Sequence, residues 1–142
     1  MKKIISLSLL LFSLFACTSD SQSYYNPYLP NVAVQLDINL DWPEYSELRH
    51  VGGVHMTTLQ GIRGIIIINT GSGFRAYDAA CPNHELRDCS TLEIKKGDIF
   101  AKCRCPEDGA RFNLHLGTSM ESDYQLHTYL VRATGNRLFI TN

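Results

Sequence analysis

Four of the five cysteines in this 142-residue chain lie in two short segments of its second half. Two loops that carry cysteine and histidine, about twenty residues apart, are a common way to build a metal or iron–sulfur site between hairpin turns. The main question is whether these loops hold a metal or iron–sulfur site, or whether the two loops are held together without a metal. The segments read Cys81-Pro82-Asn83-His84, followed by Cys89, and Cys103-Arg104-Cys105-Pro106-Glu107-Asp108-Gly109.

Residues 1–16 have the composition of an export signal. Lys2 and Lys3 form a basic start, and residues 4–15 are apolar apart from serines. This run is too short to span a bilayer, which takes roughly 20 apolar residues. Leu14-Phe15-Ala16-Cys17 resembles a lipobox, so we expect a lipoprotein signal peptide over 1–16 and lipidation of Cys17. Simple secretion is the alternative.

Removal of this segment would leave 142 − 16 = 126 residues, with 11 basic and 14 acidic side chains and a net charge of −3. This charge argues against nucleic acid as a partner. We expect a protein of the bacterial cell envelope that contacts the membrane through lipidated Cys17. Residues 17–31 are polar and contain two prolines, which predicts a tether.

The rest of the chain, residues 32–142, has the pattern of one all-β domain. Apolar residues alternate from Val32 to Leu40, which predicts a strand with one buried face. Residues 64–69 (GIIIIN) predict a strand buried on both faces, and the turn at 70–73 joins it to a return strand at 74–78. Further hairpins are expected at 91–102 and 129–141. Many short strands with close turns favour an antiparallel β-sandwich or barrel.

The segments around the cysteines also form a series. Residues 73–82 (GFRAYDAACP) lead into the first loop, 99–106 (IFAKCRCP) lead into the second, and 109–114 (GARFNL) leave it. This series resembles the Rieske [2Fe-2S] family, and the match extends over residues 32–141. The resemblance implies a Rieske-like fold in which the two loops form a small tip, and it implies electron transfer as the activity.

The resemblance assigns the four cluster positions, because the family's loops read C-x-H and C-x-x-H. Cys81 and Cys105 match the cysteines, while Asn83 and Asp108 stand where the family has histidine. An amide is a poor ligand for iron, and a carboxylate is a harder ligand than the cluster prefers. We therefore do not expect an ordinary Rieske centre at these four residues.

Another ligand set can be written for a [2Fe-2S] cluster or, less well, for zinc. It comprises Cys81, His84, Cys103 and Cys105, with Cys89 as a replacement for His84. The C-x-C spacing of the last two cysteines is uncommon in structural zinc sites. We keep this set as the alternative for a bound cofactor.

Two disulfides are the competing arrangement, because exported thiols tend to pair. In the Rieske family both ligand cysteines bind the same iron, so the resemblance implies that their sulfurs lie close together. Without a cluster it therefore implies a Cys81–Cys105 bridge, which leaves Cys89–Cys103 as the second pair.

We expect a cluster-free, disulfide-tied binding or structural module, with a protein partner of unknown identity at the loop tip. The alternative is a [2Fe-2S] electron carrier with atypical ligands. We expect neither to be an enzyme alone, because the sequence assembles no general acid, base or nucleophile. It also contains no G-x-S-x-G, phosphate-binding glycine loop or H-E-x-x-H. The remaining histidines are predicted to be surface or strand residues: His50, His55, His115 and His127.

Overall fold

The computed structural model describes residues 25–142. The predicted signal peptide, Cys17 and residues 17–24 of the predicted tether lie outside the described residues. Within residues 25–142, no helix combines the length and the apolar character needed to cross a membrane.

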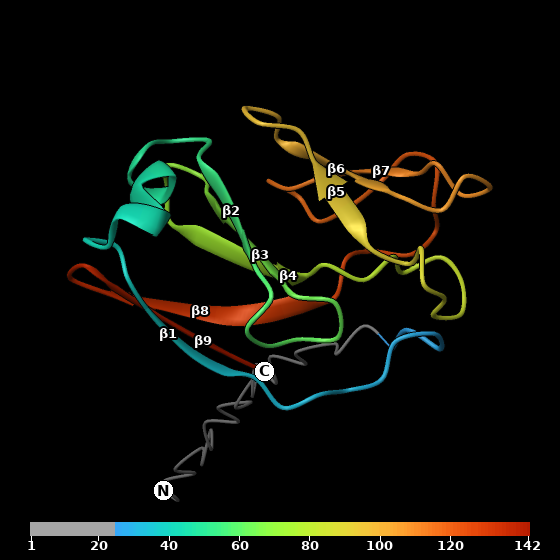
Figure 1. Cartoon of the computed structure of the whole chain (residues 1–142), viewed down its shortest axis with the longest axis horizontal. Coiled ribbons are helices and arrows are strands. Elements are labelled where there is room, and N and C mark those ends of the chain that lie inside the picture. Colours follow the sequence, from blue (N-terminus) through green and yellow to red (C-terminus); the bar gives the residue numbers. More distant parts are fainter. Residues whose placement is uncertain (1–24) are drawn as a thin grey trace, which may run out of the picture.

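The described part of the chain forms two antiparallel sheets, a curled larger one and a smaller one above one end of it (Figure 1). The larger sheet has the order β1-β9-β8-β4-β3-β2 and the smaller one β5-β6-β7. A short 3-10 helix, η1 (Pro43–Arg49), covers part of the larger sheet. The all-β prediction is confirmed. The strands are β1 (Gln35–Asn39), β2 (Val54–Thr57), β3 (Ile65–Asn69), β4 (Phe74–Asp78), β5 (Leu92–Ile94), β6 (Phe100–Cys103), β7 (Arg111–Asn113), β8 (Thr128–Thr134) and β9 (Arg137–Thr141).

Strand β3 lies between the two halves of the core. Its four isoleucines are fully buried, as the sequence predicted. Successive side chains of a strand point to opposite faces, so Ile65 and Ile67 pack with β1, β9 and η1. Ile66 and Ile68 pack instead with the small sheet and the cysteines. The second of these two core regions supports the cysteine loops.

A buried carboxylate fixes the exit of β4 toward the first cysteine loop. Asp78 is fully buried and accepts hydrogen bonds from the backbone N–H groups of Ile62 (2.6 Å), Arg63 (3.2 Å) and Ala80 (2.7 Å). It also accepts one from the hydroxyl of Tyr129 at 2.7 Å. Burial, together with this carboxylate, raises the pKa of Tyr129 strongly, so the hydroxyl stays a donor.

The segment before β1 packs against the domain. Asn26 and Leu29 are buried, and the Asn26 side-chain amide donates a hydrogen bond to the carbonyl of Pro82 at 2.9 Å. The ring of Tyr28 meets that of Tyr124 edge to face at 5.4 Å. Part of the segment predicted as a tether therefore contacts the folded part of the chain, through Asn26 at the first cysteine loop and through Tyr28. The boundary at residue 32 stays a prediction.

Candidate functional site

The two cysteine loops lie at the same end of the small sheet (Figure 1). The first loop follows β4 and closes with a bridge between Ala80 and Thr91. The second follows β6, whose last residue, Cys103, is paired with Leu92 of β5. The backbone N–H of Arg104 donates to the carbonyl of Thr91 at 3.1 Å. The segment around Thr91 is thus hydrogen-bonded on both sides and holds the loops together.

The tip cysteines form two disulfides, Cys81–Cys103 and Cys89–Cys105. The presence of two bridges was predicted, but the predicted pairing of Cys81 with Cys105 and of Cys89 with Cys103 is wrong. The reason is the strand register. Because Arg104 lies opposite Thr91, Cys105 lies beside Ser90, with its Sγ 3.9 Å from the serine Oγ. Cys89 immediately precedes Ser90 and takes Cys105, which leaves Cys103 for Cys81.

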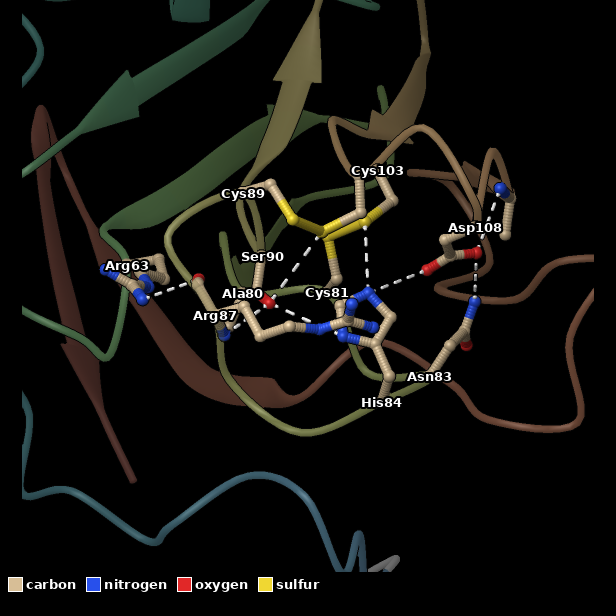
Figure 2. Close-up of a disulfide and its surroundings, with 12 residues drawn as sticks. Arg63, Ala80, Cys81, Asn83, His84, Arg87, Cys89, Ser90, Cys103 and Asp108 are labelled. Atoms are coloured by element: carbon tan, nitrogen blue, oxygen red, sulfur yellow. Dashed lines mark hydrogen bonds and ion pairs between the residues drawn. A yellow bond between two sulfur atoms is a disulfide. The ribbon is translucent and has the colours of Figure 1, made fainter.

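His84 points from the first loop toward the Cys81–Cys103 bridge (Figure 2). Its Nε2 lies 3.6 Å from Cys103 Sγ and 3.3 Å from Asp108 Oδ2. The imidazole side chain is 15% exposed and the Asp108 side chain 7%. One ligand atom each from Cys81, His84, Cys103 and Asp108 lies within 4.8 Å of all the others. We call these four residues the donor quartet.

The two residues at the family's histidine positions are hydrogen-bonded to each other. The Asn83 amide donates to Asp108 Oδ1 at 2.9 Å (Figure 2), and the backbone N–H of Ala110 donates to the same oxygen at 3.1 Å. The hydroxyl of Ser122 donates to Asn83 Oδ1. Asp108 Oδ2 is buried, and its contact with His84 does not have hydrogen-bond geometry.

The quartet differs from the ligand set written from the sequence. Cys81, His84 and Cys103 come together as that set requires, whereas Asp108 stands where Cys105 was expected. Ser122 was missed as a residue of the tip. It lies 39 positions from Asn83 in the sequence, in a loop without any motif, so no local signal indicates its role.

Comparison with known proteins gives structural neighbours only. A ferredoxin of carbazole 1,9a-dioxygenase from Nocardioides aromaticivorans is 16% identical, with 78% of this chain and 97% of that chain covered and a TM-score of 0.47. A protein described as an NADH-dependent nitrite reductase small subunit from Mycobacterium tuberculosis is 15% identical, with 79% and 97% covered and a TM-score of 0.46. The apo form of a quaternary ammonium Rieske monooxygenase is 19% identical, with 80% of this chain and 33% of that chain covered and a TM-score of 0.46.

Of these three proteins, the monooxygenase is named as a Rieske protein. No protein-family model matches the chain, and no curated protein is significantly similar in sequence.

The donor quartet does not fit a Rieske cluster. Each iron of that cluster takes two protein ligands, so two irons and their sulfides must stand between the ligand pairs. Ligands on opposite irons are separated by two metal–ligand bonds of about 2 Å and the distance between the irons. The quartet atoms lie within 4.8 Å of one another, and both sulfurs are bonded to each other. With the Cys81–Cys103 bridge in place, the quartet has no space for two irons.

Proposed function

We propose that this chain is a lipid-anchored, non-enzymatic binding module of the cell envelope, with a Rieske-like tip held by two disulfides in place of a cluster. One observation carries the proposal: the groups at the family's ligand positions are already used within the protein. Cys81 and Cys105 are in disulfides, and Asn83 is hydrogen-bonded to Asp108.

The disulfides can replace the cross-link that a cluster would provide. The bonded cysteines are separated by 22 and 16 residues, and the chain-entropy model gives each such bridge about 3 kcal/mol of stabilisation. Cys81, Cys103 and Cys105 are buried and pack with the small sheet. Their burial supports a structural role for the bridges.

A protein partner is proposed at the tip, next to the loop between β7 and β8. This loop contributes Ser122 to the tip and exposes two apolar side chains, with Leu116 65% exposed and Met120 fully exposed. Exposed apolar patches mark interaction surfaces, and both side chains belong to the loop that carries Ser122. Their position supports the tip as the contact region.

Iron and thiol analysis of protein purified without oxygen tests the cluster-free tip. We expect a colourless protein without stoichiometric iron and without free thiols among Cys81, Cys89, Cys103 and Cys105. Two irons per chain, with absorption bands that bleach on reduction, would contradict the proposal and favour the [2Fe-2S] electron carrier.

The anchor requires its own test, because Cys17 lies outside the described residues. We expect the Cys17→Ser variant, produced in a bacterial host, to lose lipid labelling and to leave the membrane fraction. A variant that stays labelled and membrane-bound would overturn the lipoprotein proposal without affecting the account of the tip.

A further inference from the structure

We propose that the reduced protein binds one divalent metal ion of the zinc class in the donor quartet of Cys81, His84, Cys103 and Asp108. This inference goes beyond the proposed function, which concerns the oxidised protein, and it differs from a Rieske cluster in metal, in nuclearity and in one ligand type.

The spacing of the donors is that of a site for one ion. Bonds of about 2.3 Å to sulfur and about 2.0–2.2 Å to nitrogen or oxygen place tetrahedral zinc ligands about 3.3–3.8 Å apart. His84 Nε2 lies 3.3 Å from Asp108 Oδ2 and 3.6 Å from Cys103 Sγ. The ligand atoms of all four residues lie within 4.8 Å of one another, and the sulfurs of Cys81 and Cys103 are bonded to each other. Reduction removes that bond and frees both sulfurs to act as separate ligands.

His84 has the orientation of a metal ligand. Its Nδ1 lies 2.9 Å from the carbonyl oxygen of Glu85. A carbonyl oxygen only accepts, so Nδ1 carries the proton and donates it. Histidines that bind metals usually donate their other ring N–H to a carbonyl or carboxylate in this way. This contact orients Nε2 toward the ligand atoms of Cys81, Cys103 and Asp108.

Asp108 supplies a buried oxygen that lacks a hydrogen bond. Its side chain is 7% exposed, and Oδ2 has no hydrogen-bond partner. The other oxygen, Oδ1, is held by the Asn83 amide and by the backbone N–H of Ala110. A buried charged oxygen without a donor is costly. A cation coordinated by Oδ2 would remove this cost, and the hydrogen bonds to Oδ1 keep the carboxylate in place.

The Cys81–Cys103 bond must first be reduced, either by a thiol or dithiol or, in vitro, by a phosphine that takes an oxygen atom from water and becomes the phosphine oxide. Two reductant thiols give up two electrons and two protons and become a disulfide, while the Cys81–Cys103 bond breaks and yields two thiols. The metal ion then binds both sulfurs as thiolates and releases two protons. The oxidised bridge excludes the ion, so metal binding depends on the redox state of Cys81 and Cys103.

Cobalt(II) titration of the purified full-length protein tests the inference. The protein is reduced with a phosphine without oxygen, the phosphine is removed, and visible absorption is followed. We expect one cobalt per chain with thiolate-to-cobalt and tetrahedral bands, displacement by one zinc, and no binding to the oxidised protein. His84→Ala and Asp108→Asn should each weaken binding at least tenfold. His115→Ala is the matched control, because His115 lies outside the quartet.

The variant pair Cys89→Ser and Cys105→Ser distinguishes the quartet from the ligand set written from the sequence. The quartet predicts that one metal still binds to this double variant after reduction, whereas the other set loses a ligand. Circular dichroism checks the fold. If reduction unfolds the protein, stoichiometric zinc should restore its structure, since metal binding then drives folding. No binding, binding unchanged in both quartet variants, or a reduced protein that stays unfolded with zinc would overturn the inference.

Discussion

At the residue scale, Asp78 decides how the chain enters the first cysteine loop. Its carboxylate gathers three backbone donors and the Tyr129 hydroxyl, with no solvent exposure. It therefore joins the segment before β3, the start of the cysteine loop and β8. Hydrogen bonds to a charged acceptor are stronger than neutral ones, and their loss leaves buried donors unsatisfied.

We predict that Asp78→Ala lowers the free energy of unfolding by at least about 3 kcal/mol, because several buried donors lose their acceptor. Tyr129→Phe removes one of these hydrogen bonds and should cost about 1–2 kcal/mol. Urea unfolding measures both. The exposed Asp88 offers the control, since Asp88→Asn should change stability by less than about 0.5 kcal/mol. If Asp78→Ala and Asp88→Asn lowered the free energy of unfolding equally, Asp78 would not anchor the entry to the first cysteine loop.

His55 gives the molecule a dependence on acid pH. Burial lowers the pKa of its imidazole below 6.5, against the opposing effect of Glu44 and Glu47. The unfolded chain therefore binds a proton more readily than the folded one, and stability falls as the pH drops below about 6.5. We predict that His55→Gln weakens this fall in urea midpoints between pH 7.5 and 5.5. His50→Gln, at an exposed position, should leave it unchanged, and an unaltered profile in the His55 variant would contradict the assignment.

Sequence reasoning at this scale located the substituted ligand positions but not their relation. The resemblance to the loops of the Rieske family indicated Asn83 and Asp108 as the positions where that family has histidine. The hydrogen bond between these two residues, which are 25 positions apart, could not be predicted because it depends on how the two loops meet. The place of Asp108 in the donor quartet also depends on how the two loops meet, so the sequence did not indicate it.

At the element scale, hydrophobic patterning predicted the strands well but not the contacts of the segment before β1. The four isoleucines of β3 indicated a buried strand, because a short continuous apolar run with adjacent turns favours that structure. Residues 25–31 contain only scattered apolar side chains, so they were predicted to be a tether. Their packing depends on single contacts such as the one from Asn26 to Pro82, which a periodic pattern does not reveal.

The docked segment predicts a loss of stability on Asn26→Ala. This change removes the amide donor to the Pro82 carbonyl and the oxygen that accepts from the Tyr28 N–H. We expect a loss of about 1–2 kcal/mol in urea unfolding, together with faster proteolysis before β1. Asn31→Ala is the matched control, because its hydrogen bond to Asn142 is exposed. A loss no larger than the control's would show that the segment is not held by Asn26.

At the scale of the whole molecule, the disulfides connect the small sheet to the rest of the core. Four cysteines permit three pairings, and the sequence alone does not choose among them. The choice depends on the register that brings Cys105 next to Ser90. This register is a long-range property of β5 and β6, so the resemblance located the cysteines but implied the wrong partners.

This arrangement predicts where the molecule opens first on reduction. The core region with Cys81, Cys103 and Cys105 includes the small sheet, whereas the region between β1, β9 and η1 contains no cysteine. We expect reduction to increase hydrogen exchange in β5, β6 and β7 well before β8 and β9. Earlier or equal exchange in the β8–β9 hairpin would contradict this order.

Peptide mass mapping of the unreduced protein tests the central claim most directly. Trypsin cleavage after Arg87 separates Cys81 from Cys89, and cleavage after Arg104 separates Cys103 from Cys105. Protein purified without oxygen and blocked with an alkylating reagent should yield linked peptides for Cys81–Cys103 and Cys89–Cys105, with no iron in the starting material. Alkylated cysteines at these positions with two irons per chain, or a Cys81–Cys105 linkage, would contradict the account.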